Sequence, residues 1–215
     1  MTSLPRYRYT TDPATNPLLM LSAQEKADMI DRMFSPESET ERRLLQDPDF
    51  IKGLFWGLPR YGHPEGQIIY HIREVLDNID RLDVTPKVRA QLRLIAFIHD
   101  TFKYREHEFR SVQPRDWSKH HSVFAWEFAK AYVDDPQVLT IIRNHDEVYY
   151  AWQMIHLYNK PKAGHARLQR VMDLCKGYRQ LYYLFFLCDT RTGDKNQAPL
   201  RWFETTVQDV EAVRW

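Results

Sequence analysis

The sequence predicts an all-α protein, and three observations support that fold class. No glycine occurs between residues 67 and 163, although glycine is a preferred residue of the tight turns between strands. Several long segments carry apolar residues at intervals of three and four, the period of one helix face. No segment shows sustained alternation of apolar and polar residues, which is typical of a half-buried strand. We therefore expect a bundle of about eight to ten helices.

The first five expected helices cover residues 22–34, 38–46, 48–56, 65–82 and 85–102. Ser22 and Glu25 have the spacing of a capping box, which opens the first of them. Thr85 followed by Pro86 opens the fifth, since proline is favoured at the first helical position after a cap.

The other four expected helices cover residues 118–133, 135–152, 166–190 and 199–212. A polar loop over residues 104–117 precedes them, and Ser118 is expected to cap the first. Asp135 followed by Pro136 opens the second.

Length and composition indicate one domain with a short extension. The chain has 215 residues, and a domain has roughly 100–200. Residues 1–21 are rich in proline and threonine and have no helical period. We expect them to form an arm on the surface, followed by a single all-α domain over residues 22–215.

Charge and hydropathy exclude some classes of protein. Thirty Lys and Arg against 29 Asp and Glu give a formal net charge of +1, which argues against a nucleic-acid partner. The longest apolar run, residues 181–188, is far shorter than the roughly 20 residues of a membrane span, and the first residues lack the apolar stretch of a signal peptide. Cys175 and Cys188 lie in an apolar segment and are expected to be buried thiols of a cytoplasmic protein.

Five ionisable residues occupy positions where the helical period calls for an apolar one. They are His71, His99, His121, His145 and Asp189, each on a different expected helix, and Asp100 adds a second carboxylate beside His99. A single histidine on an apolar face is usually a core residue with a hydrogen-bond partner, but five such cases in one chain favour a shared site.

Buried carboxylates need compensating positive charge, and no lysine or arginine lies on the same helix faces. A divalent cation would satisfy both carboxylates and use neutral imidazoles as further ligands. Mixed His and Asp ligation suits Mn²⁺, Fe²⁺, Co²⁺, Ni²⁺, Zn²⁺ or Mg²⁺, and the absence of cysteine ligands argues against a structural zinc site. The sequence therefore predicts a site for one or two divalent metal ions.

The order of these residues resembles the H…HD…D pattern of the HD-domain superfamily of metal-dependent phosphohydrolases. The segment His63-Pro64-Glu65-Gly66 followed by His71 is similar to the HPEG…H segment of the HD domain in some bacterial tRNA nucleotidyltransferases. The apolar stretches ending in the doublet at 99–100 and in the aspartate at 189 are similar to those of the family, and the resemblance covers about residues 60–195.

The resemblance implies an all-α HD-like core in which four residues bind one metal ion: His71, His99, Asp100 and Asp189. In members with two metal ions, two further histidines come from the helices between the doublet and the last aspartate. His121 and His145 fit those places, with Asp100 bridging the two ions.

Several neighbouring residues have two interpretations at this stage. His120 competes with His121, but its helix face carries Glu127, so His121 is preferred. His63 is either a residue at the mouth of the pocket or a loop residue, and Asp146 either orients His145 or lies exposed.

Lys103 is preferred for phosphate binding over the other basic candidates, Arg105, Arg143, Arg191 and Lys195. It lies one turn after His99 and either binds a phosphate oxygen or caps its helix.

The expected function is hydrolysis of a phosphate ester by a water molecule that a metal ion activates. The expected partner is a small phosphorylated substrate, such as a nucleotide. Two alternatives stay open: a non-catalytic HD-fold module that keeps its metal for binding or signalling, and an HD-fold oxygenase with two iron ions. The sequence identifies neither the substrate nor the oligomeric state.

Overall fold

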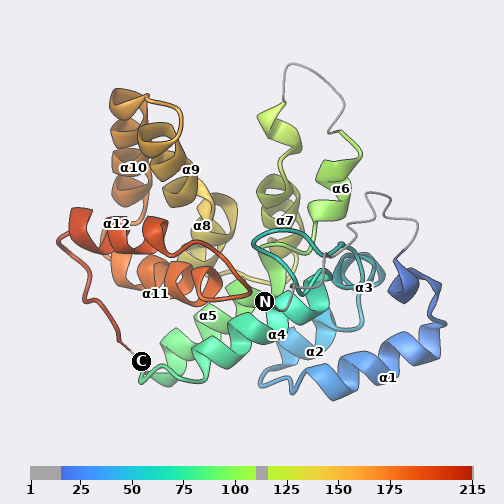
Figure 1. Cartoon of the computed structure of the whole chain (residues 1–215). Helices are drawn as coiled ribbons and strands as arrows, with labels where there is room; N and C mark the ends of the chain where they lie inside the picture. Colours follow the sequence, from blue (N-terminus) through green and yellow to red (C-terminus); the bar gives the residue numbers. More distant parts are fainter. Residues whose placement is uncertain (1–15, 110–115, 215) are drawn as a thin grey trace, which may run out of the picture.

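The structure is a computed structural model, and it describes residues 16–109 and 116–214. These residues form helices and no strand, so the prediction of an all-α fold is confirmed (Figure 1). The α-helices are α1 (Ala23–Met33), α2 (Glu39–Leu44), α3 (Pro48–Leu54), α4 (Ile68–Ile79), α5 (Pro86–Ile98), α6 (Lys103–His107), α7 (His121–Ala129), α8 (Pro136–Asn144), α9 (Glu147–His156), α10 (Pro161–Leu174), α11 (Arg179–Thr190) and α12 (Ala198–Thr206). Two short 3₁₀ helices, η2 (Pro17–Met20) and η3 (Trp117–Lys119), precede α1 and α7.

Helices α4, α5 and α11 form the centre of the bundle. Helix α4 packs on both α5 and α11, and α5 also packs on α8. The N-terminal helices α1 to α3 lie on one side of α4, and α9 to α12 lie on the other side (Figure 1). Apolar side chains such as Ile72, Leu92, Ile95 and Leu187 are fully buried between the central helices, and they form one continuous core with the surrounding ones.

Two segments that the sequence predicts as single helices are each two helices. The segment 135–152 breaks between α8 and α9, at His145 and Asp146. The segment 166–190 breaks between α10 and α11, where Gly177 has a φ of 93°. A residue with this backbone conformation ends a helix and turns the chain, which helical period alone does not reveal.

The segment before α7 also differs from the prediction. The polar loop expected over 104–117 contains the short helix α6 at its start. Helix α7 is capped by His120, whose side chain accepts a hydrogen bond from the Ser122 amide, and not by Ser118. Ser118 instead lies in η3, where Asp116 accepts a hydrogen bond from its amide.

Most of the predicted arm, residues 1–15 of 1–21, lies outside the described residues. The part that is described is attached to the bundle through Asn16. This buried side chain donates hydrogen bonds to the carbonyl oxygens of Phe55 and Gly57 and accepts one from Gln67. Among the described residues, no helix is long and apolar enough to cross a membrane.

Candidate metal centre

Four donor side chains from three helices meet at the centre of the bundle. His71 lies on α4, His99 and Asp100 directly follow α5, and Asp189 lies near the end of α11. His71 Nε2 is 3.3 Å from His99 Nε2 and 3.0 Å from Asp189 Oδ1. Asp100 Oδ2 is 3.5 Å from both ring nitrogens. We call these four residues the first donor group.

A second donor group lies on the other side of the Asp100 carboxylate. His121 is the first residue of α7, and His145 directly follows α8. Asp100 Oδ1 is 3.2 Å from His121 Nε2 and 3.5 Å from His145 Nε2, and the two ring nitrogens are 3.2 Å apart. The two oxygens of Asp100 therefore face different donor groups, as a bridging ligand would.

The hydrogen bonds at Nδ1 of the imidazole rings determine which ring nitrogen carries the hydrogen and which one faces the centre. His99 Nδ1 is 2.9 Å from the carbonyl oxygen of Ala96, and His145 Nδ1 is 2.9 Å from that of Ile142. A carbonyl only accepts, so each Nδ1 carries the hydrogen and Nε2 of the neutral ring presents a lone pair. In both groups, the Nε2 atoms of neighbouring rings thus face each other and the Asp100 carboxylate. This arrangement is repulsive unless positive charge lies between the donors.

The donor atoms also have the spacing of a coordination sphere. Ligand atoms about 2.1 Å from a metal ion are about 3.0 Å apart at right angles and about 3.4 Å apart in a tetrahedron. The contacts within the first group range from 3.0 Å to 3.6 Å. Buried neutral imidazoles with carboxylates suit divalent first-row transition metals. The residues present therefore fit a divalent metal centre.

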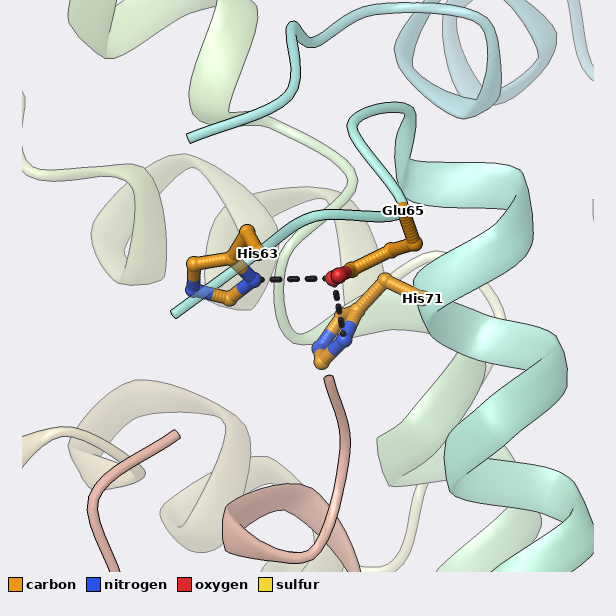
Figure 2. Close-up of side chains that lie close together, drawn as sticks. All are labelled: His63, Glu65 and His71. Carbon is orange, nitrogen blue, oxygen red and sulfur yellow. Dashed lines mark hydrogen bonds and ion pairs between the residues drawn. The ribbon is translucent and has the colours of Figure 1, made fainter. Parts of the chain in front are cut away.

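A glutamate stands behind one histidine of each donor group. Glu65 Oε1 is 3.3 Å from His71 Nδ1 and 2.9 Å from His63 Nδ1, so it joins the two rings (Figure 2). Glu106 Oε2 is 2.5 Å from His121 Nδ1 and also accepts a hydrogen bond from the His121 amide. A carboxylate in this place orients the ring and directs its Nε2 to the centre.

Two lysines pair with the carboxylates of the first donor group. Lys103 Nζ forms an ion pair with Asp100 Oδ2, and Lys195 Nζ lies 2.8 Å from Asp189 Oδ1. Burial alone would raise the pKa of both aspartates, but the nearby lysines and histidines hold these pKa values well below the usual range. Both aspartates are therefore charged at neutral pH, as metal ligands must be.

For the imidazoles of the centre, burial lowers the pKa and nearby carboxylates raise it. For His145, burial lowers the pKa, but Asp146 and Asp100 outweigh it and raise the pKa to about 9. For His63, burial dominates and lowers the pKa to about 3 in spite of Glu65. The carboxylates thus attract positive charge to the centre, whereas His63 at its edge is neutral at pH 7.

A cavity of about 300 Å³ opens onto both donor groups. Its wall includes donor atoms and both lysines: Asp100, His145, Asp146, Asp189, Lys103 and Lys195. His63, expected at the pocket mouth, also lines this cavity. The space is large enough for a small ligand that contacts both donor groups and both lysines.

Two further histidines, His120 and His107, lie outside the two donor groups. His120 is beside the second group, but its Nε2 is 2.9 Å from the Tyr150 hydroxyl. The His107 ring packs beside Trp56 at 5.7 Å between ring centroids.

Glu65 and Glu106 were not assigned to the centre from the sequence, and Asp146 and Lys195 were left undecided. Glu65 lies within the quoted motif, and Asp146 is next to His145, so proximity in the sequence is a signal for these two. Glu106 gave no such signal, and Lys195 was only one of several basic residues considered for phosphate binding. Lys195 follows α11 in a segment without helical period, and Glu106 lies in a region predicted to be a polar loop.

Buried polar contacts hold the ends of the helices that carry the donors. Asn78 of α4 donates hydrogen bonds to the carbonyl oxygens of Cys188 and Arg191, on either side of the donor on α11. Tyr182 of α11 donates to the carbonyl oxygens of Asn144 and His145, at the break between α8 and α9.

Close packing of α3 against the chain after α5 holds the doublet of His99 and Asp100 in place. A Cβ added to Gly53 of α3 would lie 1.9 Å from the carbonyl oxygen of Thr101, so only glycine lets α3 approach the residue after Asp100 this closely.

The comparison with protein families agrees with this geometry. A model of the HD domain matches residues 68–176, about half of the chain. The matched segment includes every residue of the two donor groups except Asp189. No significant match was found among curated proteins or among solved structures. The arrangement of the donors and the match together show that the chain belongs to the HD-domain family.

Proposed function

We propose that this protein is a metal-dependent phosphohydrolase that cleaves a phosphate ester of a nucleotide or another small phosphorylated metabolite. The observation that carries the proposal is the shared cavity, in which the donors of two metal positions and two lysines face the same space. A phosphate group matches this combination, because its oxygens can contact cations on two sides at once. A bound divalent ion would lower the pKa of a coordinated water and so supply the nucleophile.

The residues of the chain have separate tasks in this proposal. Asp100 holds both metal positions, one with each oxygen. Lys103 and Lys195 provide positive charge for phosphate oxygens as negative charge develops in the transition state. Asp100 and Asp189 would hold the metal ions, and the ammonium groups of Lys103 and Lys195, which pair with these aspartates here, would then be available to the phosphate. Glu65 and Glu106 keep the rings of His71 and His121 in place.

The proposal keeps the cytoplasmic setting expected from the sequence. Cys175 and Cys188 are both buried and unpaired, which fits a reducing compartment.

The test combines elemental analysis of the purified protein with phosphate release from phosphomonoesters, nucleotides and cyclic dinucleotides in the presence of Mn²⁺, Co²⁺ or Ni²⁺. Asp100→Ala should lose metal and activity together, because it removes a ligand from both positions. Asp77→Ala is the control, since Asp77 is an exposed carboxylate paired with Arg73 on α4. Full metal occupancy in Asp100→Ala would contradict the metal centre.

The same experiment separates the two alternatives. Tightly bound metal without turnover of any phosphate ester would support a binding or signalling module. Bound iron with consumption of O₂ would support an oxygenase.

A further inference from the structure

Asp146 occupies the N-cap position of α9 but does not cap the helix. Three other aspartates at such positions, Asp47, Asp116 and Asp135, each accept a hydrogen bond from an amide of the helix that follows. This is the usual use of aspartate at an N-cap. The Asp146 side chain makes no such bond. Its carboxylate is therefore held by other contacts.

The Asp146 carboxylate is directed at the second donor group. Asp146 Oδ2 is 3.3 Å from His121 Nε2 and 3.7 Å from His145 Nε2. These are the same ring nitrogens that face Asp100 Oδ1. The carboxylate also lines the shared cavity. It thus stands where a further ligand of the second position would stand.

A chain of hydrogen bonds supports Asp146 from behind. The amide of Ser122 donates to His120 Nδ1, so the hydrogen of this ring is on Nε2, opposite to His99 and His145. His120 Nε2 is 2.9 Å from the Tyr150 hydroxyl, which it reaches as a donor. The Tyr150 hydroxyl in turn donates to Asp146 Oδ2 over 3.5 Å. His120 therefore supports the carboxylate and leaves the ligand positions to the other rings.

We propose that Asp146 is a ligand of a second divalent ion, together with Asp100, His121 and His145. The inference deepens the proposed function and rests on its metal dependence. Each metal position then has two imidazoles, one carboxylate of its own and one oxygen of Asp100. With four ligands from the protein, the second ion is bound by the protein itself and does not depend on the substrate to hold it. A borderline divalent ion such as Mn²⁺, Fe²⁺, Co²⁺, Ni²⁺ or Zn²⁺ suits these donors.

The test is metal stoichiometry and affinity in the full-length protein, by elemental analysis after dialysis and by calorimetric titration of the metal-free protein with Co²⁺ or Mn²⁺. We expect two ions in the unaltered protein. Asp146→Asn should keep the first and bind the second more weakly, by more than the roughly 10–100-fold lost when an outer-shell partner is removed. Tyr150→Phe should show a smaller loss within that range.

Asp135→Asn is the matched control, because Asp135 is an N-cap aspartate outside the centre. It should bind two ions with unchanged affinity. Circular dichroism of the metal-free variants shows whether each one is folded. Two ions bound with unaltered affinity in Asp146→Asn, or a single ion in the unaltered protein, would overturn the inference.

Phosphate release is a separate readout, so the two proposals can fail independently. A protein that needs Asp146 for its second ion but hydrolyses no phosphate ester contradicts only the proposed function.

Discussion

Glu65 and Glu106 have equivalent places in the two donor groups, although they lie in unrelated parts of the chain. Each contacts Nδ1 of one histidine ligand, and the other histidine of each group uses a backbone carbonyl instead. An imidazole ring can rotate about two bonds, so a fixed acceptor at Nδ1 is needed to hold Nε2 toward the centre. We therefore expect single side chains outside the donor groups to contribute to metal affinity.

At this scale we predict that Glu106→Gln weakens the second metal position by roughly 10–100-fold and leaves the first unchanged. The amide keeps the size of the side chain but loses the negative charge that fixes the His121 ring. Calorimetric titration with Co²⁺ measures the two affinities. Glu65→Gln is the matched variant and should weaken the first position only. Equal losses at both positions in either variant would contradict separate roles for the two glutamates.

The helical period was informative for residues that begin or continue the apolar face of a helix and uninformative for Asp146, which does neither. It predicted inward positions for His71 on α4 and Asp189 on α11, and the structure brings both into the first donor group. It left Asp146 undecided, because this residue lies at a break between two helices, where the period of neither applies.

At the scale of helices, the break between α8 and α9 is what turns His145 and Asp146 toward the same point. In one continuous helix, consecutive residues would lie about 100° apart around the axis. The Tyr182 hydroxyl of α11 holds this break by donating to the carbonyl oxygens of Asn144 and His145. Carbonyls at a helix end lack intrahelical partners, so a buried donor is required there.

We predict that Tyr182→Phe lowers the free energy of unfolding by about 1–3 kcal/mol, because it leaves buried carbonyl oxygens without a donor. It should also weaken the second metal position, since the His145 backbone is no longer held. Thermal unfolding and metal titration measure the two effects.

Tyr183→Phe serves as the control for that prediction. Its hydroxyl contacts Glu204 and the amide of Val213, away from the donor groups. This variant should lose stability without losing metal affinity. If both tyrosine variants bind metal equally well, Tyr182 contributes only stability.

At the scale of the whole molecule, the buried charges of the centre link metal binding to the stability of the fold. The chain has a formal net charge of only +1, but several of its carboxylates are buried and meet beside one cavity. Without a bound metal ion, Lys103 and Lys195 balance Asp100 and Asp189 together with the nearby histidines. A bound divalent ion would add further positive charge where helices α4, α5 and α11 converge, and its binding would stabilise the folded state only.

We therefore predict that Mn²⁺ or Zn²⁺ raises the thermal midpoint of the metal-free protein. At a free metal concentration of 100 times Kd, the gain is about 2.7 kcal/mol, which corresponds to roughly 5–10 °C for a chain of this length. Thermal scans with and without a chelator measure the shift. Ca²⁺ is the comparison ion and should stabilise less, because it prefers oxygen ligands. No shift with any transition metal would contradict a metal centre in the folded protein.

The sequence by itself determined the fold class and the identity of most donors, because helical period shows which side of each helix meets the core. Helical period did not determine how the donors divide into two groups, a division that only the family resemblance implied, nor the distances at which the two oxygens of Asp100 face them. Those features depend on distances between helices far apart in the chain, and a period along one helix contains no such distance. The contacts of Lys195 with Asp189 and of Asp146 with His121 likewise depend on how α11 and the break before α9 lie beside the same cavity. The residue types were readable from the sequence, whereas the coordination geometry was set by tertiary packing.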